Sequence, residues 1–187
     1  EAKPKYLTTA EKRDVYADAG GWKQAAGTEK SGNDNASAQA ETLVAIRGLG
    51  TTAAKLNVAD ISSINWNTTS FDKSNGGTLS VTVNYNEQVT VTGTPQLSVT
   101  NGNQGSGSGR GPHVLSYASG TNTNRLTFTL AIAAANAATN ADDVLSIGAN
   151  AVSLNSGTIK EKGTNTDATI TSSAGIGTAA GTITVVA

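Results

Sequence analysis

The chain has 187 residues, and its thirteen lysines and arginines stand against fourteen aspartates and glutamates, for a net charge of −1. This length suits one well-buried domain with an extension, or two small domains. The balanced charge provides no positive field to attract a nucleic-acid backbone or an anionic membrane, so neither is expected as a partner. The low share of charged residues, 14%, and the abundance of Thr, Ser, Asn, Gly and Ala are typical of β-rich extracellular or virion proteins.

The first 58 residues differ in pattern from the rest of the chain. Thr8 precedes Glu11 by three residues, the spacing of a capping box, and Gly20-Gly21 can end a helix, so a short helix is expected over about residues 9–19. Residues 27–38 carry no large apolar side chain and are expected to be a loop or a tether. Residues 42–50, "TLVAIRGLG", are expected to pair with a sheet edge or a partner. We therefore predict a docking arm over residues 1–58.

From about residue 61 the sequence has the period of β-strands. In "TLSVTVNYNEQVTVTG", residues 78–93, apolar or aromatic residues alternate with hydroxyl and amide residues, as in a strand with one buried face. Asn86-Glu87 interrupts the run without changing its parity. This interruption predicts a bend or bulge between two lengths of strand.

The remaining strands can be placed by their β-branched and aromatic residues. They are expected at "ISSINWN", "PQLSVTNG", "HVLSYAS", "RLTFTLAI" and "GTITVVA", with short apolar pieces between residues 142 and 160. Trp66 and Phe71 flank the first of them and are expected to pack in the core or at its rim. Seven or eight strands without helical periodicity between them exclude parallel βαβ folds and predict an all-β, two-sheet antiparallel β-sandwich over residues 59–187.

Two of these segments carry a resemblance to a known family. They are "LSVTVNYNEQVTVTGTPQLSV" and "LTFTLAIAAANAATNADDVLSIGANAVSLNSGTIK". Their motifs resemble, in order and spacing, the bacterial Ig-like repeats of the SwmB type, over roughly residues 60–187. The resemblance implies an Ig-like sandwich of the kind found in cell-surface, secreted and some phage virion proteins. Where acidic repeats would hold calcium, this chain has "NAATN" at residues 136–140 and "EKGTN" at residues 161–165, so no calcium site is carried over.

The N-terminal segments carry a second resemblance. "AKPKYLTTAEKRDVYADAGGW" and "ETLVAIRGL" resemble the opening of small virion proteins from marine tailed phages, cyanophages in particular, over about a quarter of the chain. A single surface-type repeat behind a unique docking segment resembles a capsid decoration protein. The resemblance implies a place on the capsid surface and, as partners, the major capsid protein or other virion subunits. It leaves homo-oligomer formation open.

The residues that could carry chemistry favour structural roles. His113, the only histidine, follows the Gly-rich residues 102–111 and is expected to be a solvated residue at a strand entry rather than a catalytic base. The Gly-rich segment leads into a strand and lacks Gly-Lys-Ser/Thr, so it is expected to be a mobile loop and not a phosphate cradle. No catalytic residue and no cofactor is predicted, and the chain is not expected to be an enzyme.

Adjacent carboxylates at Asp142-Asp143 would point to opposite faces of an extended chain, so a turn or strand cap is expected there. Together with Asn136 and Asn140 they leave weak Ca²⁺ binding as the only metal hypothesis, because hard cations take oxygen ligands. No metal site is predicted.

The aromatic residues of the arm lie in a segment too small for a large core of its own. Such residues either anchor an interface or fold back onto the sandwich, and both alternatives stay open. The interface expected on the arm consists of Tyr6, Tyr16, Trp22, Leu43, Val44, Ile46, Arg47 and Leu49, with Arg47 pairing with a capsid carboxylate.

We therefore expect a non-enzymatic virion structural protein that decorates or cements a phage capsid through its N-terminal arm. The first alternative is a bacterial cell-surface or secreted Ig-like adhesion module, with an extracellular location. The second is a carbohydrate-binding module or a hydrolase accessory domain.

Overall fold

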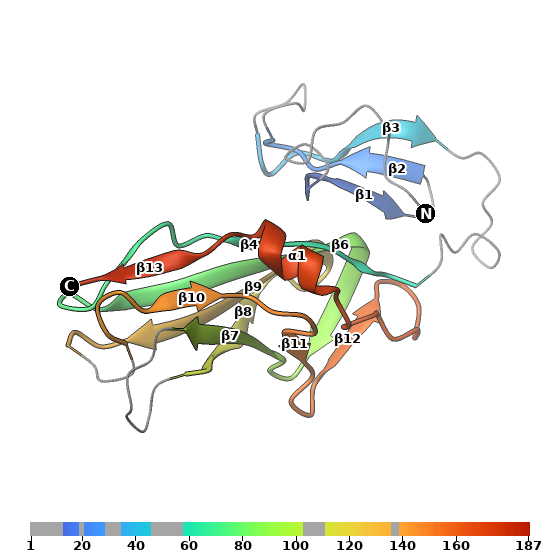
Figure 1. Ribbon diagram of the computed structural model, residues 1–187. Helices are drawn as coiled ribbons and strands as arrows, with labels where there is room; N and C mark the ends of the chain where they lie inside the picture. The colour runs from blue at the N-terminus through green and yellow to red at the C-terminus, as the bar shows by residue number, and fades with distance from the viewer. Residues whose placement is uncertain (1–12, 19–20, 29–34, 46–57, 103–110, 136–138) are drawn as a thin grey trace.

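We examined a computed structural model, which describes residues 13–18, 21–28, 35–45, 58–102, 111–135 and 139–187. These residues form thirteen strands and one short helix (Figure 1). In chain order the elements are β1 (Val15–Asp18), β2 (Gly21–Gln24), β3 (Glu41–Ala45), β4 (Ile61–Trp66), β5 (Phe71–Asp72), β6 (Gly77–Thr92), β7 (Gln96–Gly102), β8 (His113–Ser119), β9 (Thr123–Ile132), β10 (Val144–Ser146), β11 (Val152–Ser153), β12 (Thr158–Glu161), α1 (Ala174–Ala179) and β13 (Ile183–Val186). The all-β fold predicted from the sequence is confirmed.

The strands form one continuous hydrogen-bonded path, in the order β3-β2-β1-β6-β9-β8-β7-β10-β13-β5. β4 and β12 pair with β6, and β11 pairs with β7. Pairing among the described strands is antiparallel except between β1 and β6 and between β13 and β5. We call β4 to β13 with α1 the main body, and β1 to β3 the N-terminal sheet.

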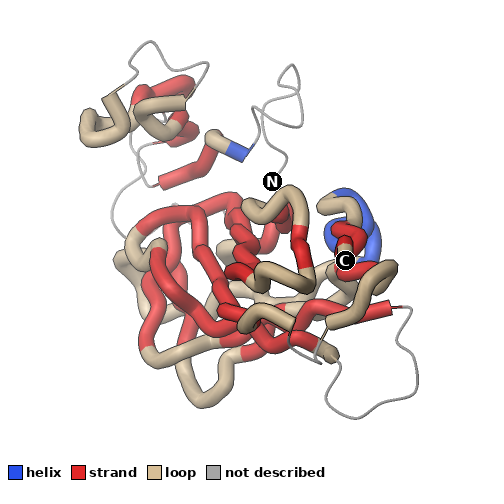
Figure 2. The backbone as a smooth tube through the Cα atoms, turned by 90° about the vertical axis from the view of Figure 1, so that its left-hand side faces the viewer, coloured by secondary structure: helices blue, strands red, loops and turns tan. Residues whose placement is uncertain are grey.

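Apolar and polar residues alternate along β6, and the apolar ones face the core of the main body. Leu79, Val81 and Val83 on this strand are fully buried, and they share one core with residues of the strands at the far end of the path, such as Leu145 and Val185. The path must therefore curl back on itself, and Figure 2 shows the strands of the main body arranged around that core. Phe71 is buried in it and Trp66 packs against it, as the sequence indicated.

The interruption at Asn86-Glu87 is a true irregularity of a single long strand. β6 runs unbroken from residue 77 to residue 92, but its register with β9 shifts between Asn84 and Val89. This register shift lies where the sequence predicted a bend or bulge. It leaves several consecutive β6 residues buried, including the polar Asn84 and Glu87.

The short helix expected over residues 9–19 is wrong where the structure describes it, since Val15–Asp18 is strand β1. The physical reason is pairing: β1 aligns antiparallel with β2, placing Ala17 opposite Trp22. Val15 and Tyr16 also favour a strand, and these contacts outweigh the local capping signal of Thr8 and Glu11, which lie outside the described residues.

The expected seven or eight strands were too few, because β4 to β13 alone are ten. The two-residue strands β5 and β11 lack enough sequence to show a period. The short helix α1 was also missed, since its sequence "AGIGTA" contains two glycines. Gly177 is buried in this helix, and a Cβ there would collide with the backbone oxygen of Ile147, so the close approach requires glycine.

Candidate functional site

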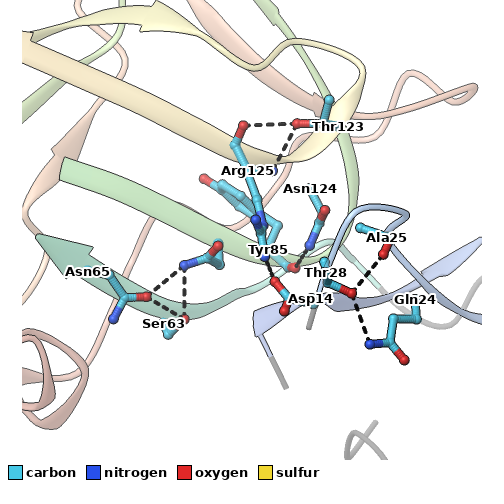
Figure 3. A network of polar contacts seen from close by, with 11 residues as sticks. Asp14, Gln24, Ala25, Thr28, Ser63, Asn65, Tyr85, Thr123, Asn124 and Arg125 are labelled. Carbon is cyan, nitrogen blue, oxygen red and sulfur yellow. Dashed lines mark hydrogen bonds and ion pairs between the residues drawn. The ribbon is translucent and has the colours of Figure 1, made fainter. Parts of the chain in front are cut away.

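The N-terminal sheet has a small core of its own. Val15, Ala17 and Trp22 form a buried cluster separate from the main core. At the end of β2, the side-chain Nε2 of the buried Gln24 donates to Thr28 Oγ1 at 3.0 Å, and Thr28 Oγ1 donates to the Ala25 carbonyl at 2.9 Å (Figure 3). Backbone pairing of β1 with β2 and of β2 with β3 joins the three short strands into one sheet.

The outer edge of this sheet is strand β3. Within the described part of the chain, β3 pairs only with β2, so its other side presents backbone groups that no described strand pairs. Leu43 is 39% exposed and Val44 is 50% exposed, although both are large apolar residues. An edge strand with exposed apolar side chains is a ready template for pairing with another chain.

Among the described residues, an ion pair and a strand pairing join the N-terminal sheet to the main body. Arg125 of β9 makes an ion pair with Asp14, just before β1 (Figure 3). Ala17 of β1 pairs in parallel with Glu87 in the irregular part of β6. The bulge of β6 therefore provides one of the two attachments.

Two buried carboxyl groups meet at that attachment. Glu87 is 5% exposed and Glu161 of β12 is 7% exposed, and the two carboxyl groups lie close enough to interact. Burial, then the charge of Glu161 and that of Asp60, raise the pKa of Glu87 to about 8. Glu87 therefore holds a proton at neutral pH, and two like charges are not buried side by side.

A polar cleft of about 510 Å³ lies between the start of the N-terminal sheet and strands β4, β6 and β9. Its walls are formed by Arg13, Asp14, Asn65, Trp66, Asn67, Thr82, Asn84, Arg125 and Thr127. The amides are fixed: Asn84 Nδ2 donates to Asn65 Oδ1 at 3.0 Å and to Ser63 Oγ at 3.1 Å. Figure 3 shows this cluster beside the Arg125–Asp14 pair. The cleft thus combines fixed amides and hydroxyls with two guanidinium groups.

His113 is not the solvated residue expected from the sequence. It is 4% exposed at the start of β8, and its Nε2 lies 3.3 Å from Asn101 Nδ2, whose amide also donates to Asp143 Oδ2 at 3.1 Å. Burial lowers the pKa of His113, and Asp143 partly opposes this. The antiparallel pairing of β7 with β8 and with β10 brings these residues together. No local sequence pattern predicts this contact.

Asp143 acts as predicted for a residue that caps a turn. It is fully buried, and its Oδ2 accepts a hydrogen bond from the Asn140 backbone N–H at 2.8 Å. Among the described residues, no three His, Cys, Asp or Glu side chains gather as a metal site would require. Asn136 and the central Gly-rich residues 103–110 lie outside the described residues.

The predicted interface residues divide into three groups. Leu43 and Val44 lie exposed on β3, while Tyr16 and Trp22 are each 7% exposed. Trp22 packs with Val15 and Ala17 in the small core of the N-terminal sheet, which is separate from the main core, so it does not fold back onto the sandwich. The role of these aromatics in an interface stays a prediction. The others, Tyr6, Ile46, Arg47 and Leu49, lie outside the described residues.

Three residues of these sites were not predicted from the sequence: Glu87, Asn84 and Arg125. For Glu87 a signal existed, because a charged residue stands at an odd position of β6, where the pattern requires an apolar one. Asn84 stands at a position of β6 where the alternation predicts a polar residue, and nothing in the pattern of β9 distinguishes Arg125. Only the pairing of β4, β6 and β9 brings the two residues to one cleft.

Comparisons with known protein families, with curated proteins and with solved structures found no match. In the part of the chain that the structure describes, no helix is long and apolar enough to cross a membrane.

Proposed function

We propose that the protein is a non-enzymatic structural protein of a tailed-phage virion that decorates or cements the capsid. The N-terminal sheet docks on the major capsid protein or a neighbouring virion subunit, and the main body, an Ig-like sandwich, projects from the particle. The resemblance of the N-terminal segments to small phage virion proteins supports this class of function.

The observation that carries the proposal is the exposed edge of β3. Leu43 and Val44 are 39% and 50% exposed in a sheet that otherwise buries its aromatic residues. Burying such side chains against a partner contributes about 25 cal/mol per Å² of apolar surface removed from water. Backbone pairing along β3 would add the directionality that orients the main body.

A second candidate function is an adhesion module of a bacterial surface or secreted protein. The polar cleft beside Arg125 favours it, because fixed amides and guanidinium groups suit a hydrophilic ligand. In this alternative the main body, rather than the edge of β3, makes the functional contact.

The genomic setting separates the two. A decoration protein is encoded among head genes and is found by mass spectrometry in purified virions in many copies per particle. An adhesion module belongs to a long reading frame with tandem repeats and is absent from virions. The first result is expected, and the second would overturn the proposal.

A further inference from the structure

We propose that the polar cleft between the N-terminal sheet and strands β4, β6 and β9 binds a saccharide that carries a carboxylate, such as a uronic-acid unit. The inference holds for either candidate function, since it concerns the cleft and not the edge of β3.

The cleft carries a net positive charge. Arg13 and Arg125 both line the cleft, and Asp14 is the one acidic residue among its lining side chains. Asp14 pairs with Arg125, so the second guanidinium leaves the cleft with a net positive charge. An anionic group between the two arginines would relieve their mutual repulsion.

The guanidinium groups of the two arginines are incompletely hydrogen-bonded. Among the described residues, the Nε atoms of Arg13 and Arg125 are both buried without a hydrogen-bond partner. Leaving a buried charged donor unpaired is costly, on the order of 1–3 kcal/mol or more. Burial, and after it the nearby charge of Arg13, lowers the pKa of Arg125, which shows that the two cations are close enough to interact. A carboxylate matches the geometry of the guanidinium donors and can accept two hydrogen bonds from one arginine.

One wall of the cleft is uncharged. Asn67 Nδ2 donates to Thr82 Oγ1 at 3.0 Å and to Ser80 Oγ at 2.9 Å, so its amide is held in place. Asn65 Oδ1 accepts a hydrogen bond from Asn84 Nδ2 and is held in the same way. Oxygen atoms of an amide or hydroxyl can accept more than one hydrogen bond, so this fixed wall can accept hydrogen bonds from sugar hydroxyls, whereas a simple anion would not use it.

The cleft is large enough for a sugar, and an indole ring borders it. A cleft of about 510 Å³ is large for an inorganic ion and within the range of small-molecule sites. Trp66 borders it, with its indole Nε1 donating to the Gly181 carbonyl at 3.2 Å. A fixed indole offers apolar surface to the C–H groups of a sugar ring.

The test is calorimetric titration of the full chain with digalacturonate, with digalactose as the uncharged control and acetate as the carboxylate alone. Digalacturonate should bind, and digalactose and acetate should bind more weakly by roughly tenfold or more. Arg13→Gln should weaken digalacturonate binding by a similar factor. Lys162→Gln, which removes the same charge from a side chain outside the cleft, should leave it unchanged.

Three results would overturn the proposal. The first is that digalacturonate does not bind to the folded wild-type chain. The second is that acetate binds as well as digalacturonate, which would make the cleft an anion site without sugar recognition. The third is equal weakening by Arg13→Gln and Lys162→Gln, which would indicate non-specific attraction. A further variant tests the uncharged lining of the cleft. Thr127→Val removes a hydroxyl from the lining and retains the charges. It should weaken binding of digalacturonate without lowering the melting temperature, and unchanged binding would contradict recognition of the sugar hydroxyls by this lining.

Discussion

Arg125 on β9 forms an ion pair with Asp14, which immediately precedes β1. The pair links two segments more than a hundred residues apart in the chain, and it lies at the joint between the N-terminal sheet and the main body. Beside it, Ala17 pairs with Glu87. The position of the proposed docking edge relative to the main body depends on these two contacts.

The ion pair should orient the N-terminal sheet more than it stabilises the protein. The side chains of Arg125 and Asp14 are 40% and 22% exposed, and pairs of this kind contribute about 0–1 kcal/mol. Asp14→Asn should therefore shift the unfolding transition of the main body very little. It should speed amide hydrogen exchange in β1 and β2, measured by mass spectrometry. Unchanged exchange in β1 would show that the pair does not hold the joint.

The buried carboxyl pair predicts a dependence of stability on pH. An ordinary glutamic acid titrates near 4.5, whereas burial and the charges of Glu161 and Asp60 raise the pKa of Glu87 to about 8. Between these values the unfolded chain has lost a proton that the folded chain keeps. The free energy of unfolding should therefore fall as pH rises from about 4.5 to about 8, and level off above that.

Urea denaturation across this range measures the slope, and Glu87→Gln should flatten it because the amide does not titrate. Glu41→Gln, on the exposed edge strand β3, is the matched control and should retain the slope of the wild type. An identical slope in wild type and Glu87→Gln would contradict the assignment.

His113 offers a direct test of its burial. Because it is the only histidine, its imidazole signals in an NMR titration are unambiguous. Burial lowers its pKa below the ordinary value of 6.5, so this residue contributes stability that is present above pH 6.5 and is lost as the pH falls through its folded pKa. The titration midpoint should lie below 6.5. A midpoint at or above that value would mean that the imidazole is solvated or forms an ion pair with Asp143.

The strands could be predicted where the sequence alternates over enough residues to fix the buried face. β6 and β9 are of this kind, and so are β7 and β8, which lie between them in the chain. The alternation identifies the buried face because a shift of the strand by one residue would turn its apolar side chains to solvent. The two-residue strands, and a helix with two glycines in six residues, have no such signal.

The polar sites could not be predicted because their contacts are non-local. Asn101 meets Asp143 across 42 residues of sequence, and Asp14 meets Arg125 across a still longer stretch. Which polar side chain is buried depends on strand order, which a single sequence does not specify. β1 shows the same limit: pairing with β2 decided its structure against a local helix signal.

The curled path of the sheet predicts that β10 is part of the core. Leu145 on β10 is fully buried in the same cluster as Val81 of β6. Leu145→Ala should lower the free energy of unfolding by about 2–5 kcal/mol, the usual cost of such a cavity. Val186→Ala on the neighbouring β13, where the side chain is 51% exposed, should change it by less than about 0.5 kcal/mol. Equal, small effects would place β10 outside the core.

The exposed edge of β3 is tested most directly by binding to capsids that lack this protein. Purified chain is mixed with such particles, which are then sedimented, and bound copies are counted by quantitative mass spectrometry. The double variant Leu43→Asp, Val44→Asp, which adds two negative charges, is compared with wild type and with Val114→Asp, which adds one negative charge at an exposed valine of β8 in the main body. All three should melt alike, because the substituted side chains are exposed.

Wild type and Val114→Asp should saturate the particles, while the double variant should bind more weakly by a factor on the order of ten or more. Full occupancy by the folded double variant would contradict docking through β3, and loss of binding only in Val114→Asp would transfer the contact to the main body.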